Sequence, residues 1–277
     1  MRLAAVLFAA LIAAPIALAP AARAAEDAAL RALITGDESR GWEAVGRIDI
    51  GRSGFCTGTL ISDNLVLTAG HCLYDEHTGD RIPVSQFQFL AGWRDGRAAA
   101  YRAVRRAVHH PDYQFRGRSG RIAVVNDLAL LELDKPIRTS AIRPFGIGTR
   151  PRKGDAVGVV SYAHDRDDKP ALQETCHVLA RQSGSLILSC SVDFGSSGAP
   201  IFTTVDGVPQ IVSVVSAKAE ARGRKVSLGT ALEEPLADLR AALAAGDGVF
   251  TRPAPEVRTM TLDALRQTQG GAKFVRP

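Results

Sequence analysis

From Trp42 onward, hydrophobic residues fall in short runs that Gly, Asp, Asn and Pro interrupt, a pattern typical of β-strands. The first six runs are Ala44–Ile50, Phe55–Ile61, Leu65–Ala69, Gln86–Ala91, Arg102–Val108 and Leu128–Leu133. After a connector at Ile137–Gly154, the next six are Ala156–Tyr162, Leu172–Ala180, Leu186–Cys190, Pro200–Thr203, Ile211–Ser216 and Val226–Thr230. We therefore expect an all-β fold of two six-stranded antiparallel β-barrels, over residues 41–140 and 141–231.

Two other segments have a helical pattern. Residues 232–246 place Leu at helical spacing before Gly246, which predicts a C-terminal helix. Glu26–Ile34 is rich in Ala, Leu and Arg and predicts a short helix within a leader or pro-segment over residues 25–40. The tail at 247–277 is polar and contains several Pro and Gly residues. It could lie over the surface, occlude a cleft, or be mobile.

The first 24 residues have the pattern of a signal peptide. Arg2 precedes an apolar run over Leu3–Leu18, and Ala22-Arg23-Ala24 offers a small-x-small cleavage site. A membrane anchor is the alternative, but Pro15 and Pro20 interrupt a run already shorter than the roughly 20 residues that a span needs. We expect cleavage near Ala24 and a secreted or periplasmic protein with no membrane segment.

Composition and charge restrict the partners. The chain has 46% hydrophobic and 23% charged residues, as globular proteins do, and a formal net charge of +5. Its basic residues are scattered rather than clustered with aromatics, so we expect no nucleic-acid partner. The histidines show no metal-ligand spacing among themselves, and we expect no metal and no cofactor.

Four cysteines in an exported protein predict two disulfides. Three pairings are possible, and the local one joins Cys56 to Cys72 and Cys176 to Cys190. A zinc site is the alternative, but no C-x-x-C pair occurs.

Three short motifs carry candidate chemistry. His71 follows a strand in Leu67–Cys72, Asp127 precedes a buried apolar run, and Ser197 stands in the small-residue turn Gly195–Pro200. Each alone is usually structural, since such residues populate turns for conformational reasons. Together, in the order His, Asp, Ser on a chain of two β-barrels, they match the chymotrypsin-type arrangement.

The sequence resembles the trypsin-like (chymotrypsin-type) serine protease family over roughly Gly41–Ala245. Thr68–Cys72 is similar to T-A-A-H-C with Gly70 for the second Ala, and D-L-A-L-L after Asn126 is similar to D-I-A-L-L. Gly195–Pro200 resembles G-D-S-G-G-P, and the compact second barrel resembles the small bacterial members grouped with glutamyl endopeptidases.

This resemblance implies a chymotrypsin-like fold and a serine endopeptidase acting on polypeptides. Ser197 would attack the substrate carbonyl, His71 would act as general base and acid, and Asp127 would orient His71. The N–H groups of Gly195 and Ser197 would form the oxyanion hole. The resemblance also implies that Cys56 and Cys72 brace the histidine loop.

The sequence departs from the family in two places. Ser196 replaces the acid that pairs with a newly released α-amino group, so we expect hydrogen bonds to hold the oxyanion hole instead. Ser191, Ser216 and Lys218 are the predicted substrate-binding residues, but Lys218 stands where the family has Gly, and the P1 preference stays open.

The main alternative function is an inactive homologue that serves as a binding protein, because one fold hosts several functions. Such homologues typically lose a triad residue, and here all three are present. An α/β-hydrolase esterase would need its histidine after the serine, whereas the last histidine, His177, precedes Ser197. We expect an active monomeric protease.

Overall fold

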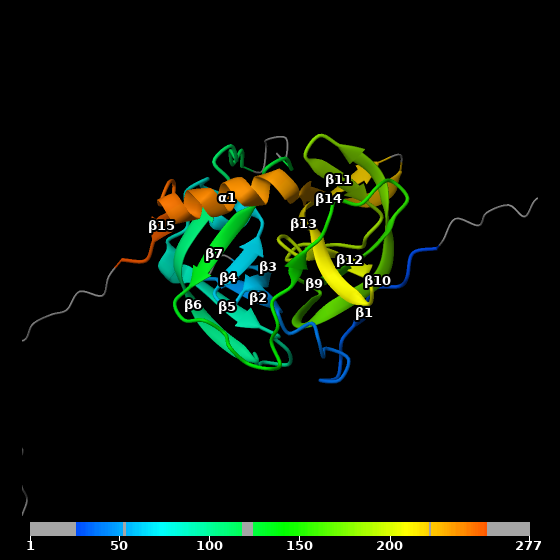
Figure 1. Cartoon of the computed structure of the whole chain (residues 1–277), viewed down its shortest axis with the longest axis horizontal. Coiled ribbons are helices and arrows are strands. Elements are labelled where there is room, and N and C mark those ends of the chain that lie inside the picture. Colours follow the sequence, from blue (N-terminus) through cyan, green and yellow to red (C-terminus); the bar gives the residue numbers. More distant parts are fainter. Residues whose placement is uncertain (1–25, 52–53, 118–123, 222, 254–277) are drawn as a thin grey trace, which may run out of the picture.

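The computed structural model describes residues 26–51, 54–117, 124–221 and 223–253. Within them two β-barrels lie side by side, and one α-helix runs along the first (Figure 1). No helix in these ranges is long and apolar enough to cross a membrane. The predicted signal peptide at 1–24 and the tail beyond residue 253 lie outside the described residues and stay predictions.

Six antiparallel strands of the first barrel pair in the order β6-β5-β2-β3-β4-β7, and β6 also pairs with β7, so the sheet returns on itself. A short strand β15 pairs with β6. The elements are β2 (Val45–Ile50), β3 (Gly54–Ser62), β4 (Leu65–Thr68), η1 (Gly70–Leu73), η2 (Val84–Gln86), β5 (Phe87–Ala91), β6 (Ala100–His109), β7 (Ala129–Leu133) and β15 (Phe250–Thr251).

The second barrel repeats this design in the order β10-β11-β14-β13-β12-β9, with a further pairing between β9 and β10. The short strands β1 and β8 add to β10 and β13. The elements are β1 (Arg31–Ala32), β8 (Gly146–Ile147), β9 (Ala156–Ala163), β10 (Arg166–Gln182), β11 (Ser185–Leu188), β12 (Pro200–Val205), β13 (Val208–Ala221) and β14 (Arg224–Ala231).

The fold confirms the predicted all-β class with a C-terminal helix, and the structure differs from the prediction in its shortest elements. Strands β1, β8 and β15 have two residues each, too few to show a hydrophobic period. The predicted helix at Glu26–Ile34 is wrong, because Arg31 and Ala32 instead pair with Leu172 and Ala171 of β10. An isolated helix this short is marginal, whereas a strand edge offers partners for its backbone.

Aromatic packing joins the two barrels. The ring of Phe202, on β12 of the second barrel, lies 5.1 Å from that of Trp42 and 4.7 Å from that of Phe145, centroid to centroid. Helix α1 (Glu233–Ala245) packs beside β6 and β7 through Leu236, Leu239 and Leu243 and ends at Gly246. The φ of Gly246 is +83°, a conformation that glycine adopts without strain. These contacts fix the orientation of the barrels that carry the site.

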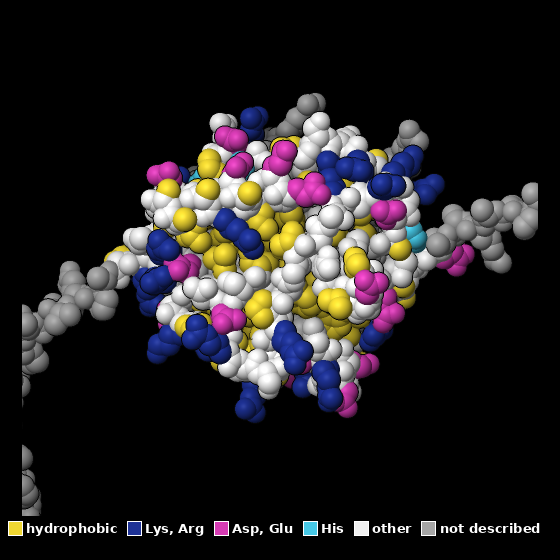
Figure 2. Space-filling model, in the orientation of Figure 1, with side chains coloured by type: hydrophobic (Ala, Val, Ile, Leu, Met, Phe, Trp, Pro, Cys, Tyr) yellow, Lys and Arg dark blue, Asp and Glu magenta, His cyan; other side chains and the backbone are white. Residues whose placement is uncertain are grey.

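On the face shown in Figure 2, basic side chains are interspersed with acidic ones rather than gathered in one patch.

The N-terminal segment contributes to the core as well as to the sheet. Leu33 is fully buried, and its N–H donates to Pro170 O at 2.9 Å, whereas the neighbouring Ile34 is 63% exposed.

We predict that Leu33→Ala lowers the free energy of unfolding by about 2–5 kcal/mol, because it removes a buried side chain and leaves a cavity. Ile34→Ala is the matched control and should change stability by about 0.5 kcal/mol or less. Urea unfolding of both variants checks this. Equal effects would show that the segment does not belong to the folded core.

Candidate active site

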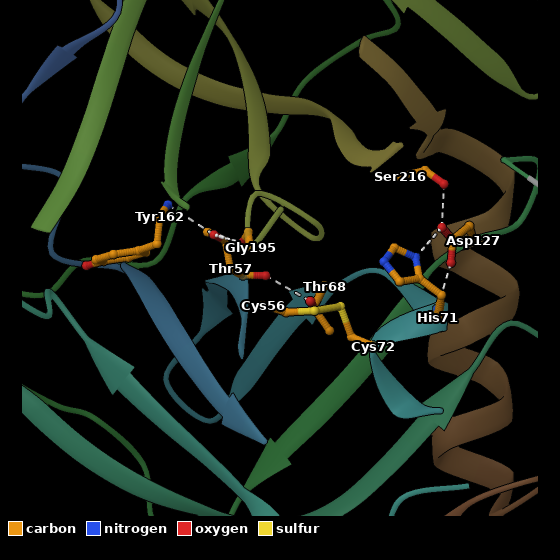
Figure 3. Close-up of a disulfide and its surroundings, with 9 residues drawn as sticks. All are labelled: Cys56, Thr57, Thr68, His71, Cys72, Asp127, Tyr162, Gly195 and Ser216. Atoms are coloured by element: carbon orange, nitrogen blue, oxygen red, sulfur yellow. Dashed lines mark hydrogen bonds and ion pairs between the residues drawn. A yellow bond between two sulfur atoms is a disulfide. The ribbon is translucent and has the colours of Figure 1, made fainter. Parts of the chain in front are cut away.

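Strand register brings His71 and Asp127 together. Strands β4 and β7 are antiparallel neighbours, with Thr68 opposite Ala129, so the residues after β4 lie beside those before β7. The Asp127 carboxylate accepts the backbone N–H of His71 at 2.8 Å through Oδ1, and its Oδ2 lies 2.8 Å from His71 Nδ1 (Figure 3). The carboxylate therefore fixes both the position and the orientation of the imidazole.

Asp127 is 1% exposed, and a buried charge of this kind needs several partners. Besides His71, the hydroxyl of Ser216 on β13 donates to Asp127 Oδ2. Tyr113 also lies beside Gly70, next to this carboxylate. A Cβ at Gly70 would lie 3.1 Å from the Tyr113 ring and 3.2 Å from Asp127 Oδ1. The glycine thus makes room for the tyrosine beside the carboxylate.

Burial and the nearby carboxylate set the protonation of these groups. Burial by itself lowers the pKa of His71, but the charge and hydrogen bond of Asp127 outweigh it and raise the pKa above the usual 6.5. Burial, together with Asp127, raises the pKa of Tyr113 far above its ordinary range, so its hydroxyl stays neutral. The buried Asp127 carboxylate therefore makes the imidazole of His71 more basic than usual.

Ser197 lies in a turn in which two positions accept only glycine. Gly195 and Gly198 have φ of +94° and +81°. A Cβ at Gly195 would lie 2.4 Å from the Phe55 ring, and one at Gly198 would lie 2.1 Å from Thr68 Oγ1. Backbone bonds hold the turn at 2.8 Å, from Thr57 N–H to Ser197 O and from Gly198 N–H to Val215 O.

Ser196, the residue that departs from the family motif, is fully buried and hydrogen-bonded. Its hydroxyl donates to Tyr162 O at 3.1 Å and accepts the N–H of Asp193 at 3.3 Å. The position usually held by an acid is therefore filled by a neutral group with neutral partners.

A cleft of about 420 Å³ contains the candidate residues. His71, Asp127 and Ser197 all line it. The remaining lining is mixed apolar and polar and comprises Glu76, Tyr113, Gln114, Phe115, Arg116, Gly117, Val192, Asp193, Phe194, Val215, Ser216, Ala217 and Lys218.

The three predicted substrate-binding residues lie in different settings. Ser191 is exposed and is not among the residues that line the cleft, and its N–H donates to Gln173 Oε1 at 2.7 Å. Ser216 lines the cleft, but its hydroxyl is used by Asp127.

Lys218 also lines the cleft and is already paired. Its Nζ lies 2.6 Å from Asp193 Oδ1 and 3.8 Å from the centroid of the Phe194 ring. The hydrogen bond from Lys218 holds the pKa of the Asp193 carboxyl below its usual range.

Both predicted disulfides are present. Cys56–Cys72 ties β3 to the turn that carries His71, and Cys176–Cys190 links β10 to the segment after β11. The first bond therefore braces the histidine turn.

The sequence analysis missed Thr57 and Tyr113. Thr57 Oγ1 donates to Gly195 O at 2.9 Å and accepts the N–H of Tyr162 at 3.1 Å. Its signal is a hydroxyl inside an apolar strand run, where an unpaired polar group would be costly. Tyr113 has no local signal, because its partner Asp127 lies 14 positions away in the sequence.

Comparison with known proteins agrees with this geometry. The family model named Trypsin matches residues 34–233. The chain belongs to the trypsin family. This confirms the predicted resemblance to the trypsin-like serine protease family.

The curated relatives of this trypsin-family chain match it in part. Bovine (Bos taurus) serine protease 23 is 28% identical over 163 residues, 53% of this chain and 43% of that protein. Trypsin of Phaedon cochleariae is 33% identical over 96 residues, 32% of each chain. The chain thus spans less than half the length of these relatives.

A solved structure of Glu endopeptidase is similar to the trypsin-family chain in fold. The TM-score is 0.62 at 19% identity, with 80% of this chain and 97% of that chain covered.

We predict that Asp127→Asn lowers the pKa of His71, because it removes the charge that holds a proton on the imidazole. In the wild type, His71 binds its proton more tightly in the folded chain than in the unfolded chain, so protonation of His71 stabilises the fold. This contribution to stability is complete below about pH 6.5 and is lost as the pH rises through the raised pKa of His71. NMR titration of His71 in a Ser197→Ala background measures the change. Asp80→Asn, an exposed carboxylate, should leave the pKa unaltered, and an equal shift there would contradict the assignment.

Proposed function

We propose that this chain is an exported serine endopeptidase that hydrolyses peptide bonds through Ser197, His71 and Asp127. The observation that carries the proposal is the 2.8 Å contact between the buried Asp127 carboxylate and His71 Nδ1, at a cleft that Ser197 also lines. With Nδ1 held by the carboxylate, Nε2 is left to exchange a proton with a serine hydroxyl.

The reaction follows from these positions. His71 takes the hydroxyl proton as Ser197 Oγ attacks the carbonyl carbon, and a tetrahedral oxyanion forms. His71 then gives that proton to the leaving amine, and the C–N bond breaks to leave an acyl-enzyme. Water, deprotonated by His71, attacks the ester carbonyl. The C–O bond to Ser197 then breaks, the acid is released, and His71 returns the proton to Ser197 Oγ. Asp127 stabilises the imidazolium at both stages and itself stays ionised.

The backbone N–H groups of Gly195 and Ser197 are the proposed oxyanion donors. Phe194 O accepts the N–H of His164 at 2.8 Å. Since the C=O and N–H of a trans peptide point in opposite directions, this bond directs the Gly195 N–H away from His164. A preorganised donor of this kind is typically worth about 10²–10³ in rate.

A polypeptide is the proposed substrate, and the proposed triad is supplied by one chain, which supports action as a monomer. The relatives named serine protease and trypsin support a peptide substrate. The rival function is a binding protein on the same fold.

We predict that a fluorophosphonate probe labels Ser197, because the phosphorus reacts only with an activated serine. Ser197→Ala should abolish labelling, and His71→Ala should slow it by about 10⁴-fold or more. His77→Ala, an exposed histidine outside the cleft lining, should react like the wild type. Peptide mapping identifies the labelled residue. A folded wild-type chain that resists the probe would favour the binding protein.

We also propose export to the periplasm or the medium. The two disulfides support it, since such bonds persist in oxidising compartments. Expression of the full chain in a bacterial host with a secretion system, followed by N-terminal sequencing, should yield a mature chain that starts at Ala25. A cytoplasmic product that begins at Met1 would contradict export.

A further inference from the structure

The hydroxyl of Thr57 is fully buried and joins the two barrels. It lies on β3 of the first barrel, donates to Gly195 O at 2.9 Å and accepts the N–H of Tyr162, on β9 of the second, at 3.1 Å (Figure 3). The backbone of Thr57 adds a bond on each side, since its N–H donates to Ser197 O and its carbonyl accepts Thr68 Oγ1. The hydroxyl and the N–H of Thr57 thus bond to the second barrel, whereas its carbonyl bonds to β4 of its own barrel.

Residues outside the loop hold the peptide groups on both sides of Gly195. Phe194 O accepts the His164 N–H at 2.8 Å, and Gly195 O accepts the Thr57 hydroxyl. Gly195 itself is packed, with Phe55 and Ala163 occupying the space where a side chain would begin. Its N–H therefore has one direction available while both carbonyls keep their partners.

A further anchor of the loop is Tyr162, the residue whose N–H the Thr57 hydroxyl accepts. Ser196 Oγ donates to Tyr162 O, so the backbone N–H and carbonyl of Tyr162 are both engaged, one through Thr57 and one through Ser196. These anchors are neutral, and none requires a charged α-amino group.

We propose that Thr57 is a positioning residue, whose hydroxyl holds the loop of residues 193–198 in the conformation that directs the Gly195 N–H toward the reacting oxyanion. The inference rests on the proposed function. Thr57 is not among the residues that line the cleft, so it acts through Gly195 and not on the substrate. Its loss should lower kcat much more than it raises KM, because a donor misplaced by the loop is needed mainly in the transition state.

Three variants isolate the hydroxyl. Thr57→Val keeps the shape and removes both bonds, whereas Thr57→Ser keeps the hydroxyl and removes only a methyl group. Thr59→Val is the matched control. Thr59 points to the same side of β3 two residues on, is also fully buried, and its Oγ1 has no hydrogen-bond partner within the ranges that the structure describes.

The readouts are hydrolysis of a fluorogenic peptide selected from a library, inhibition by a peptide aldehyde, and hydrogen exchange of residues 193–199. We expect Thr57→Val to lower kcat by about 10–10²-fold with KM changed less than about threefold, and to weaken the aldehyde, whose hemiacetal oxygen uses the same donors, by a similar factor. Thr57→Ser and Thr59→Val should stay within about threefold of the wild type.

Three results would overturn the proposal, two in activity and one in hydrogen exchange. One is a folded Thr57→Val protein with wild-type kcat and aldehyde affinity. The second is an equal loss in Thr59→Val, which would indicate a packing effect. Hydrogen exchange reads the loop even in a chain that hydrolyses nothing. Faster exchange at 193–199 in Thr57→Val alone supports the role of Thr57 independently, whereas unchanged exchange refutes it, and wild-type labelling at Ser197 separately decides the proposed function.

Discussion

A buried negative charge, the carboxylate of Asp127, is the group on which the rest of the site depends. Removing an ion from water costs several kcal/mol unless partners replace its hydration. Here the partners come from both barrels, since His71 belongs to the first and Ser216 to the second. The Asp127 carboxylate therefore has all of these hydrogen-bond partners only when the two barrels are packed together. The same carboxylate orients the imidazole of His71.

On the opposite side of the site, the peptide groups around Gly195 are held by uncharged partners. Ser196 is buried among neutral partners, and the loop around Gly195 is anchored by hydrogen bonds to Tyr162, His164 and Thr57. Neutral anchors of this kind are complete once the chain has folded and require no newly released amino terminus. The N-terminal segment has a different role in this chain, because its backbone extends the sheet at β10 and Leu33 fills the core.

Short-range chemistry explains what could be predicted. Twelve strands could be predicted because each contains several hydrophobic residues between turn residues. The helix over 233–245 could be predicted because Leu recurs on one face before Gly246. The segment Glu26–Ile34 was misread for the same reason. Its local preference is helical, but the free edge of β10 offers backbone partners that no local pattern records.

By itself the sequence determined the all-β class, the family and the residue types of the candidate site, since these are written in periodicity and in motifs a few residues long. Only the tertiary structure decided which partners those residues meet. It assigned the hydroxyl of Ser216 to Asp127, left Ser191 exposed outside the cleft lining, and paired Lys218 with Asp193. The physical reason is that a hydrogen bond is set by distances of about 3 Å between groups far apart in the chain, and strand register, not sequence spacing, fixes those distances.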